Sequence, residues 1–306
     1  MEYAILGKTG ARVSKLGLGG APLGGVFGAA DELEVEKMIH EAVDAGVNVI
    51  DTAPSYAQGE SERRIGKALQ GGKRERVFLM TKAVGPGQRF GREETIRSVE
   101  DSLTRLRTDR VELLQIHDAE QRPFEEIAYE TLPALERLRE EGKIRWIGVS
   151  TRDLALLGRY VGLGRFDCIQ FYARYTLIDH TAKDELLPLA KDAGVGVIQG
   201  SPLGLGLLAD APAPFLERYV TEEAARRMED LRFLRRQEPR GLVEPAMRFS
   251  LSRPDIHVTL TGAATRDVLR ANLAYCDGRG LDPEDEARVY ALFRGRKLFR
   301  DRGDAQ

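Results

Sequence analysis

The chain has 306 residues, a length at which an α/β barrel is the main alternative to splitting into two domains. Its 46 Lys and Arg against 48 Asp and Glu leave a net charge of -2, which provides no basic field for nucleic acid or an anionic membrane. The two cysteines lack C-x-x-C spacing, which fits a reducing cytoplasm, and no apolar run approaches the ~20 residues of a membrane span. We therefore expect a single cytoplasmic domain over residues 1–306. We expect its partner to be a small molecule.

Short extended segments at residues 3–5 and 12–14, separated by Gly7 and Gly10, predict an N-terminal hairpin. Apolar strand-like runs then alternate with stretches of helical spacing. The predicted strands are residues 16–20, 47–52, 77–82, 111–117, 144–150, 168–172, 195–201 and 258–262. The predicted helices are residues 33–45, 61–69 with Ser61 as N-cap, 96–106, 125–141, 153–161, 184–193, 243–252 and 266–274.

An internal sequence repeat supports this order. DAGVNVIDTAP at residues 44–54 and DAGVGVIQGSP at residues 192–202 both contain the end of a helix, a glycine that terminates it and a buried strand. Eight largely apolar strands alternating with helices predict a (β/α)8 TIM barrel. The alternative is an open doubly wound sheet. A long Gly, Ala and Pro-rich loop at residues 203–220 follows the seventh strand, before a charged helix at residues 221–236, and an extra C-terminal helix is expected at residues 283–293.

Polar residues end three neighbouring strands of this barrel. Asp51, Lys82 and His117 close the second, third and fourth strands, and Tyr56 lies on the loop after the second. Each residue alone has an ordinary structural explanation, such as a turn former or a solvated cation. Because the carboxyl ends of barrel strands meet at one site, the presence of all four residues there favours a catalytic function.

These four residues suit proton transfer to or from an alcohol or carbonyl oxygen. A free tyrosine has a pKa of ~10, and a nearby cation such as Lys82 lowers it by favouring the phenolate. Asp51 would hold Lys82 in place, and His117 would orient the substrate oxygen. The set lacks a metal cluster or a strong carbon nucleophile, so hydride from a nicotinamide is the natural complement. G-x-G-x-x-G, H-E-x-x-H, G-x-S-x-G and Walker A motifs are absent from the sequence.

These residues and their surroundings resemble the aldo-keto reductase family over nearly the whole chain. The motifs are NVIDTAPSYAQGESERRIGKAL at residues 48–69, Lys82 after VFLMT, LLQIHD at 113–118, GKIRWIGVS at 142–150 and SPLGLGLL at 201–208. The resemblance implies a barrel that binds NAD(P)(H) across its mouth and transfers hydride to or from C4 of the nicotinamide. It places the family's catalytic tetrad on Asp51, Tyr56, Lys82 and His117.

The resemblance also assigns cofactor positions. Ser150 and Gln170 match residues that hydrogen-bond the carboxamide, Thr151 stands where asparagine is usual, and Ser201 and Leu203 match the loop over the pyrophosphate. Gly200 replaces the aromatic that often stacks on the nicotinamide, which leaves Tyr172 or Tyr175 as candidates. The further expected cofactor positions are Gly20, Gly262, Ala263, Ala264 and Asn272.

The adenosine end departs from the pattern of NADPH-using members. Gly262 and Val268 stand where those members carry a lysine and an arginine for the 2'-phosphate. Losing two charge-assisted contacts weakens NADP binding unless Arg266 or Arg270 replaces them. We therefore expect NAD(P)(H) as cofactor, with NAD slightly favoured.

FYARYTLID at residues 171–179 resembles the sugar-oxidising branch, the L-galactose and D-threo-aldose (L-fucose) 1-dehydrogenases. This favours oxidation of an aldose at C1 to a lactone. The alternatives are an NADPH-dependent reductase of aldehydes or ketones, and a cofactor-binding regulatory subunit without turnover. The loops expected to shape the substrate site lie around Phe27, at residues 85–92 and at residues 203–220, and they contain no readable code.

Overall fold

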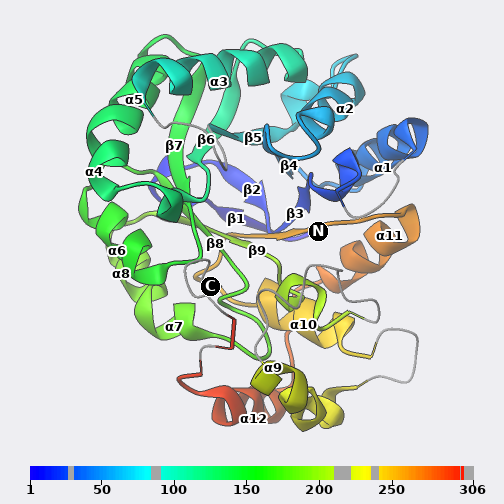
Figure 1. Cartoon of the computed structure of the whole chain (residues 1–306). Coiled ribbons are helices and arrows are strands. Elements are labelled where there is room, and N and C mark those ends of the chain that lie inside the picture. The colour runs from blue at the N-terminus through cyan, green and yellow to red at the C-terminus, as the bar shows by residue number, and fades with distance from the viewer. Residues whose placement is uncertain (27–30, 84–90, 210–221, 236–240, 297, 300–306) are drawn as a thin grey trace.

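A computed structural model describes residues 1–26, 31–83, 91–209, 222–235, 241–296 and 298–299. Within these ranges eight parallel strands close into a barrel in the order β10-β3-β4-β5-β6-β7-β8-β9 (Figure 1). They are β3 (Leu16–Gly19), β4 (Val49–Asp51), β5 (Phe78–Ala83), β6 (Val111–Ile116), β7 (Ile144–Ser150), β8 (Cys168–Tyr172), β9 (Gly196–Gly200) and β10 (Val258–Thr261). The predicted barrel is confirmed, and the open sheet is excluded because β10 pairs with both β3 and β9.

Helices surround the barrel and bury their apolar faces against the outside of its strands (Figure 1). They are α1 (Glu32–Asp44), α2 (Glu60–Ala68), α3 (Arg92–Leu106), α4 (Phe124–Glu126), α5 (Leu132–Glu140), α6 (Leu154–Gly162), α7 (Thr181–Glu185), α8 (Leu187–Asp192), α10 (Val243–Leu251) and α11 (Arg266–Tyr275). This layer is one of two apolar cores, and the other fills the barrel interior.

The N-terminal hairpin closes one end of the barrel. Strands β1 (Tyr3–Ile5) and β2 (Arg12–Ser14) pair antiparallel, as predicted. Leu6 and Val13 are fully buried and belong to the interior core, together with Val49, Met80 and Leu113 from the barrel strands. The hairpin therefore plugs the amino ends of the strands, and the carboxyl ends at the opposite face remain available for a site.

Two helix predictions were wrong in detail. The helix expected at residues 125–141 contains a π-helical stretch at Ile127–Thr131 between α4 and α5. The helix expected at residues 184–193 begins earlier and is divided into α7 and α8, where Pro188 follows the break and supplies no amide hydrogen for a continuous helix.

Ser61 is not the N-cap of α2. The cap position is Gly59, whereas the Ser61 hydroxyl donates to the Gly20 carbonyl at 2.7 Å and contacts Thr52 Oγ1 at 2.8 Å. The serine therefore ties α2 to the ends of two barrel strands instead of to its own first turn.

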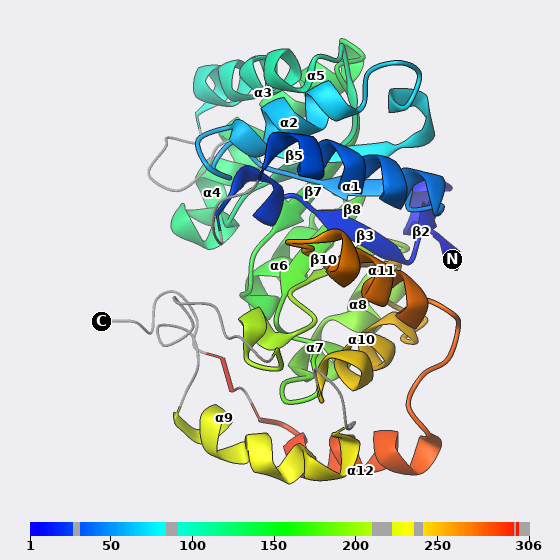
Figure 2. The ribbon, with the colours of Figure 1, turned by 90° about the vertical axis from the view of Figure 1, so that its right-hand side faces the viewer.

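The C-terminal helix α12 (Pro283–Phe293) lies outside the barrel, as expected, beside α9 (Glu222–Arg227) (Figure 2). The charged helix expected at residues 221–236 is α9 followed by a 3-10 helix at Met228–Leu234. Arg227 Nη2 donates to the Leu292 carbonyl at 3.0 Å and joins the two segments. The predicted loop regions at residues 27, 85–90 and 210–220 lie outside the described residues, and the helices within the described ranges include none suited to crossing a membrane.

Gly66 of α2 provides a test of the helix packing. A β-carbon at Gly66 would lie 2.5 Å from the Leu106 carbonyl carbon of α3, a backbone atom that cannot move aside cheaply. Gly66→Ala should therefore lower the free energy of unfolding by ~1–3 kcal/mol through overpacking, although alanine in a helix normally gains ~0.5–1 kcal/mol. Urea unfolding measures this change.

Gly162 at the end of α6 is the matched control, because a β-carbon there meets no atom within 4 Å. Gly162→Ala should be neutral or stabilising. Equal effects of the two substitutions would show that α2 and α3 do not approach as closely as described.

Candidate active site

The carboxyl ends of the barrel strands gather the four predicted polar residues. Asp51 ends β4, Lys82 lies near the end of β5, and His117 directly follows β6. Lys82 is two residues beyond Met80, which pairs with Asp51 and points into the barrel interior, so Lys82 points inward too. The residues Asp51, Lys82 and His117 are 3%, 0% and 7% exposed.

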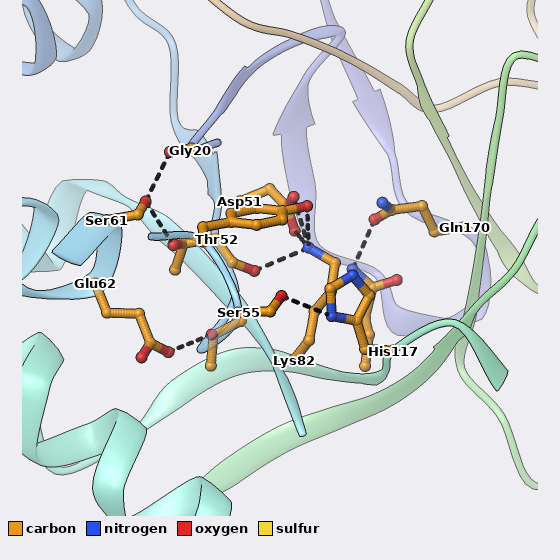
Figure 3. A network of polar contacts seen from close by, with 12 residues as sticks. Gly20, Asp51, Thr52, Ser55, Ser61, Glu62, Lys82, His117 and Gln170 are labelled. Carbon is orange, nitrogen blue, oxygen red and sulfur yellow. Dashed lines mark hydrogen bonds and ion pairs between the residues drawn. The ribbon is translucent and has the colours of Figure 1, made fainter. Parts of the chain in front are cut away.

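Lys82 is the centre of the cluster (Figure 3). Its Nζ donates to Asp51 Oδ1 and Oδ2 at 2.7 and 2.8 Å and to the Thr52 carbonyl at 2.8 Å. The same nitrogen lies 3.4 Å from the Tyr56 hydroxyl, on the half-buried loop after β4. One buried ammonium therefore connects the carboxylate to the phenol.

His117 completes the group on the other side of Tyr56. The two rings meet edge to face, with centroids 5.9 Å apart and planes at 85°. Ser55 Oγ lies 3.4 Å from His117 Nδ1. An imidazole held beside a phenol can donate to or accept from the same small-molecule oxygen.

Burial and charge act in opposite directions on these groups. Burial is the largest single influence on Lys82 and disfavours its ammonium form. The charges of Asp51 and Tyr56 and the hydrogen bonds to them together outweigh burial, so the pKa of Lys82 is raised above its ordinary value. Burial raises the pKa of Tyr56, and the lowering by Lys82 does not overcome it. Lys82 thus acts in the expected direction, but in the protein alone Tyr56 remains a protonated phenol at neutral pH.

Backbone strain concentrates at this mouth. Among the described residues, left-handed non-glycine conformations occur mainly in loops after the strands, the exception being Arg107 at the end of α3. They are Ala57, Gln58, Asp118, Ala173, Ser201 and Leu205, with φ between 47° and 57°. Such conformations cost of order 1 kcal/mol or more each and are typical of functional sites.

Ser150 and Gln170 lie on neighbouring strands and pair in register. Gln170 Oε1 accepts from Gln115 Nε2 at 2.7 Å, while its own amide nitrogen makes no hydrogen bond to any residue that the structure describes. A carboxamide presents one acceptor and two donor hydrogens, so a serine hydroxyl beside a free amide donor fits that group of a nicotinamide. Thr151 differs, because its Oγ1 accepts from the Asp153 amide at the start of α6.

Other predicted cofactor positions have structural roles. The Gly20 amide donates to the Asp51 carbonyl at 2.7 Å, and a β-carbon there would lie 2.5 Å from that oxygen. Ser201 and Leu203 begin the loop after β9, as expected. Tyr175 is excluded as a stacking residue, because it is fully buried on Phe249 with ring centroids 4.8 Å apart. Tyr172 lies beside Gly200 and is the remaining candidate.

The segment after β10 is poor in free positive charge. Gly262 and Ala264 are exposed, whereas Ala263 and Asn272 are buried. Arg270 Nε donates to Glu41 Oε1 of α1 at 2.5 Å. Arg266 lies 3.3 Å from Glu34 and 3.8 Å from Glu41. Both arginines are thus paired with carboxylates.

Three residues at the mouth were not predicted as site residues. Ser55 contacts His117, Gln115 orients Gln170, and Asp118 accepts from the Tyr172 hydroxyl at 3.1 Å. The sequence could have suggested Gln115 as a site residue, because it is a polar residue inside the largely apolar strand β6. Asp118 and Tyr172 are distant in sequence, and no local pattern links them. Within the described ranges no His, Cys, Asp and Glu side chains are grouped so as to hold a metal ion.

A closed parallel barrel with a buried lysine, a carboxylate, a phenol and an imidazole at its mouth defines an oxidoreductase of the aldo-keto reductase type. The profile described as the aldo/keto reductase family matches residues 15–293, and the chain belongs to this family. Members of the family generally use NAD(P)H, and the chain is accordingly an NAD(P)-dependent oxidoreductase.

The relatives are similar over nearly their whole length. L-galactose dehydrogenase of Arabidopsis thaliana is 33% identical over 303 residues, 95% of this chain and 94% of the relative. NADH-specific methylglyoxal reductase of Escherichia coli (strain K12) is 31% identical, covering 90% and 93%. D-threo-aldose 1-dehydrogenase of Pseudomonas sp is 28% identical, covering 87% and 90%. The holo form of aldo-keto reductase AKR11C1 from Bacillus halodurans superposes with a TM-score of 0.81 at 27% identity, over 97% of each chain.

The buried pair of Lys82 and Asp51 predicts a large and non-additive effect on stability. Asp51→Asn leaves an uncompensated buried ammonium and should lower the free energy of unfolding by ~3–5 kcal/mol. Adding Lys82→Met should recover part of that loss, because it removes the unpaired charge. Urea unfolding of the two single variants and the double variant at neutral pH gives the coupling, and strictly additive effects would contradict the ion pair.

The sign of the pH dependence follows from Lys82. Because its pKa is raised above the ordinary 10.5, the stability that this charge contributes is fully present below that pH and is lost as the pH rises through the folded-state value.

Proposed function

We propose that the protein is a cytoplasmic, NAD-preferring dehydrogenase that oxidises an aldose sugar at C1 to a lactone. The observation that carries this proposal is the contact of one buried ammonium, Lys82, with both the Asp51 carboxylate and the Tyr56 hydroxyl. Bound NAD+ would supply the hydride acceptor at C4 of its nicotinamide.

In this proposal Tyr56 moves the proton. The phenol of Tyr56, which is protonated in the protein alone, must first lose its own proton to solvent. The phenolate then takes the proton of the C1 hydroxyl as the C1 hydrogen leaves as hydride, so that a carbonyl forms at C1. Lys82 stabilises the phenolate, and Asp51 keeps Lys82 charged and in place. His117, 5.9 Å from Tyr56 between ring centroids, orients the sugar oxygen.

The polar rim supports a substrate with several hydroxyl groups. Asp118 directly follows His117, and its carboxylate accepts from Tyr172 at 3.1 Å and from Gln121 at 3.3 Å. A carboxylate beside the reacting position suits sugar hydroxyls better than a purely apolar aldehyde. The similarity to L-galactose dehydrogenase and D-threo-aldose 1-dehydrogenase agrees with this substrate class.

We infer the preference for NAD from the charges after β10. NADPH-using members carry a lysine at the position of Gly262. In this chain a β-carbon at Gly262 would lie 2.6 Å from Pro22 Cγ, so the position has no room for that side chain. Arg266 and Arg270 are paired with Glu41 and would have to leave it to bind a 2'-phosphate. Ser150, Gln170, Ser201 and Leu203 are proposed to hold the nicotinamide and pyrophosphate parts, which NAD and NADP share.

Reduction of an aldehyde with NADH is the second candidate. The raised pKa of Tyr56 leaves the phenol protonated in the protein alone, which is the state needed to donate a proton to a carbonyl oxygen. NADH-specific methylglyoxal reductase is among the similar proteins. The same four residues would then act in the reverse direction.

Tyr56→Phe tests the proton-transfer role. We expect kcat for oxidation of L-galactose or L-fucose with NAD+ to fall by roughly 100- to 10,000-fold, because the acid-base group is lost. The Kd for NAD+, measured by calorimetry, should be nearly unchanged. Tyr129→Phe is the matched control, since Tyr129 is 70% exposed and outside the cluster. Retained turnover in Tyr56→Phe would refute the role of Tyr56.

Val268→Arg tests the cofactor preference. A cation at the half-buried position 268 should strengthen NADP+ binding by about tenfold and leave NAD+ binding unchanged, because it adds a charge-assisted phosphate contact. Val268→Gln controls for side-chain size. The wild-type ratio of Kd values should favour NAD+, and a wild-type preference for NADP+ would contradict the proposal.

A further inference from the structure

The loop after β9, residues 201–208, has an unusual backbone, and we name it the β9 loop. Ser201, Gly204, Leu205 and Gly206 all have positive φ, at 53°, 57°, 57° and 101°. Short turns hold it internally, such as the bond from the Gly204 amide to the Ser201 carbonyl at 3.0 Å. Serine and leucine adopt this conformation at a cost, so contacts from elsewhere must favour it.

Two residues from the far end of the chain reach this part of the molecule. Leu298 and Phe299, which follow α12, are 2% and 1% exposed. The Leu298 amide donates to Asp179 Oδ2 at 3.2 Å. Arg174 Nη1 donates to the Phe299 carbonyl at 3.0 Å and to Asp179 Oδ2 at 3.1 Å.

This attachment is rigid and buried. Arg174 and Asp179 lie in the segment between β8 and α7 and are 1% and 0% exposed. Arg174 Nε also donates to the Arg152 carbonyl, at 3.2 Å, just beyond the end of β7. A guanidinium with several fixed acceptors keeps little freedom, so the backbone of Leu298 and Phe299 is held against the carboxyl ends of β7 and β8.

The ring of Phe299 then lies directly on the β9 loop. A β-carbon built on Gly204 would be only 2.8 Å from Phe299 Cζ, and 3.7 and 3.8 Å from its two ε carbons. The α-carbon of Gly204 therefore packs against the edge of the ring, and both a side chain at 204 and a displacement of the loop toward Phe299 are blocked.

We infer that Phe299 is a positioning residue for dinucleotide binding, which acts by holding the β9 loop in its strained conformation. The inference rests on the proposed function, in which Ser201 and Leu203 of this loop cover the cofactor pyrophosphate. Without the ring, the loop can relax away from its left-handed conformations. The loop then has to be reordered each time a dinucleotide binds, and it releases the dinucleotide faster.

The test compares two buried phenylalanines near the C-terminus. Phe299→Ala should raise the Kd for NADH, measured by fluorescence titration of the full chain, by about tenfold or more, mainly through a faster koff in stopped-flow experiments. Phe293→Ala is the matched control, because Phe293 is fully buried in α12, whereas the three atoms nearest to a β-carbon at Gly204 all belong to Phe299. It should lower the Tm but leave the Kd within about twofold.

Gly204→Ala approaches the contact from the other side and protects the test against a poorly folded Phe299→Ala. Its methyl group would collide with the ring, so it should also raise the Kd for NADH. If Phe299→Ala is soluble, the double variant Phe299→Ala/Gly204→Ala should raise the Kd for NADH by less than the product of the two single fold-increases. The reason is that the small residue at 299 leaves room for the methyl group at 204.

An unchanged NADH Kd and koff in Phe299→Ala, or in Gly204→Ala if the first variant does not fold, would overturn the inference. An equal loss of affinity in Phe293→Ala would also overturn it, because the effect would then be general destabilisation. In both cases wild-type turnover with NAD+ would be unaffected, and the proposed function would stand. A wild-type chain that binds neither NADH nor NADPH would refute both.

Discussion

The burial of the Lys82 ammonium is the constraint on which the site depends. Removing such a charge from water costs several kcal/mol unless oxygen atoms replace its hydration. Asp51 and Thr52 provide three of them from the end of β4, at 2.7 to 2.8 Å. These bonds require the register in which Asp51 pairs with Met80 of β5, so the same interaction that neutralises the lysine also aligns two strands. The Tyr56 hydroxyl, at 3.4 Å, is the fourth oxygen near the ammonium, and it is the group that moves the proton in the proposed function.

The two ends of the barrel are organised in opposite ways. At the amino ends of the strands, Leu6 and Val13 of the hairpin extend the apolar interior core and shield it from solvent. At the carboxyl ends, polar side chains are buried and loop residues such as Asp118 and Ser201 adopt strained conformations. A packed barrel tolerates this strain because its stability comes from the two large apolar cores.

Under the proposed function, cofactor recognition depends on the partners of the polar side chains at the mouth as well as on those side chains themselves. Arginines near the end of β10 would suggest an affinity for phosphate, but Arg266 and Arg270 both form ion pairs with Glu41 of α1. At the position proposed for the nicotinamide, Gln115 donates to the carbonyl oxygen of the Gln170 side chain and leaves its amide nitrogen available. In both places a residue distant in sequence limits what its partner can bind: Glu41 acts in this way on the arginines, and Gln115 on Gln170.

The sequence by itself determined the order of the elements, the closed barrel and the four residues centred on Lys82, because side-chain periodicity and strand ends are local properties. It failed where distant segments meet. Tyr175 was a candidate for the nicotinamide until the fold stacked it on Phe249, and Ser61 was expected to cap its own helix but bonds Gly20. The pKa of Tyr56 also needed the tertiary structure, since burial outweighs the neighbouring cation. The contact of Phe299 with Gly204 had no local signal, because it joins residues that only the folded chain brings together.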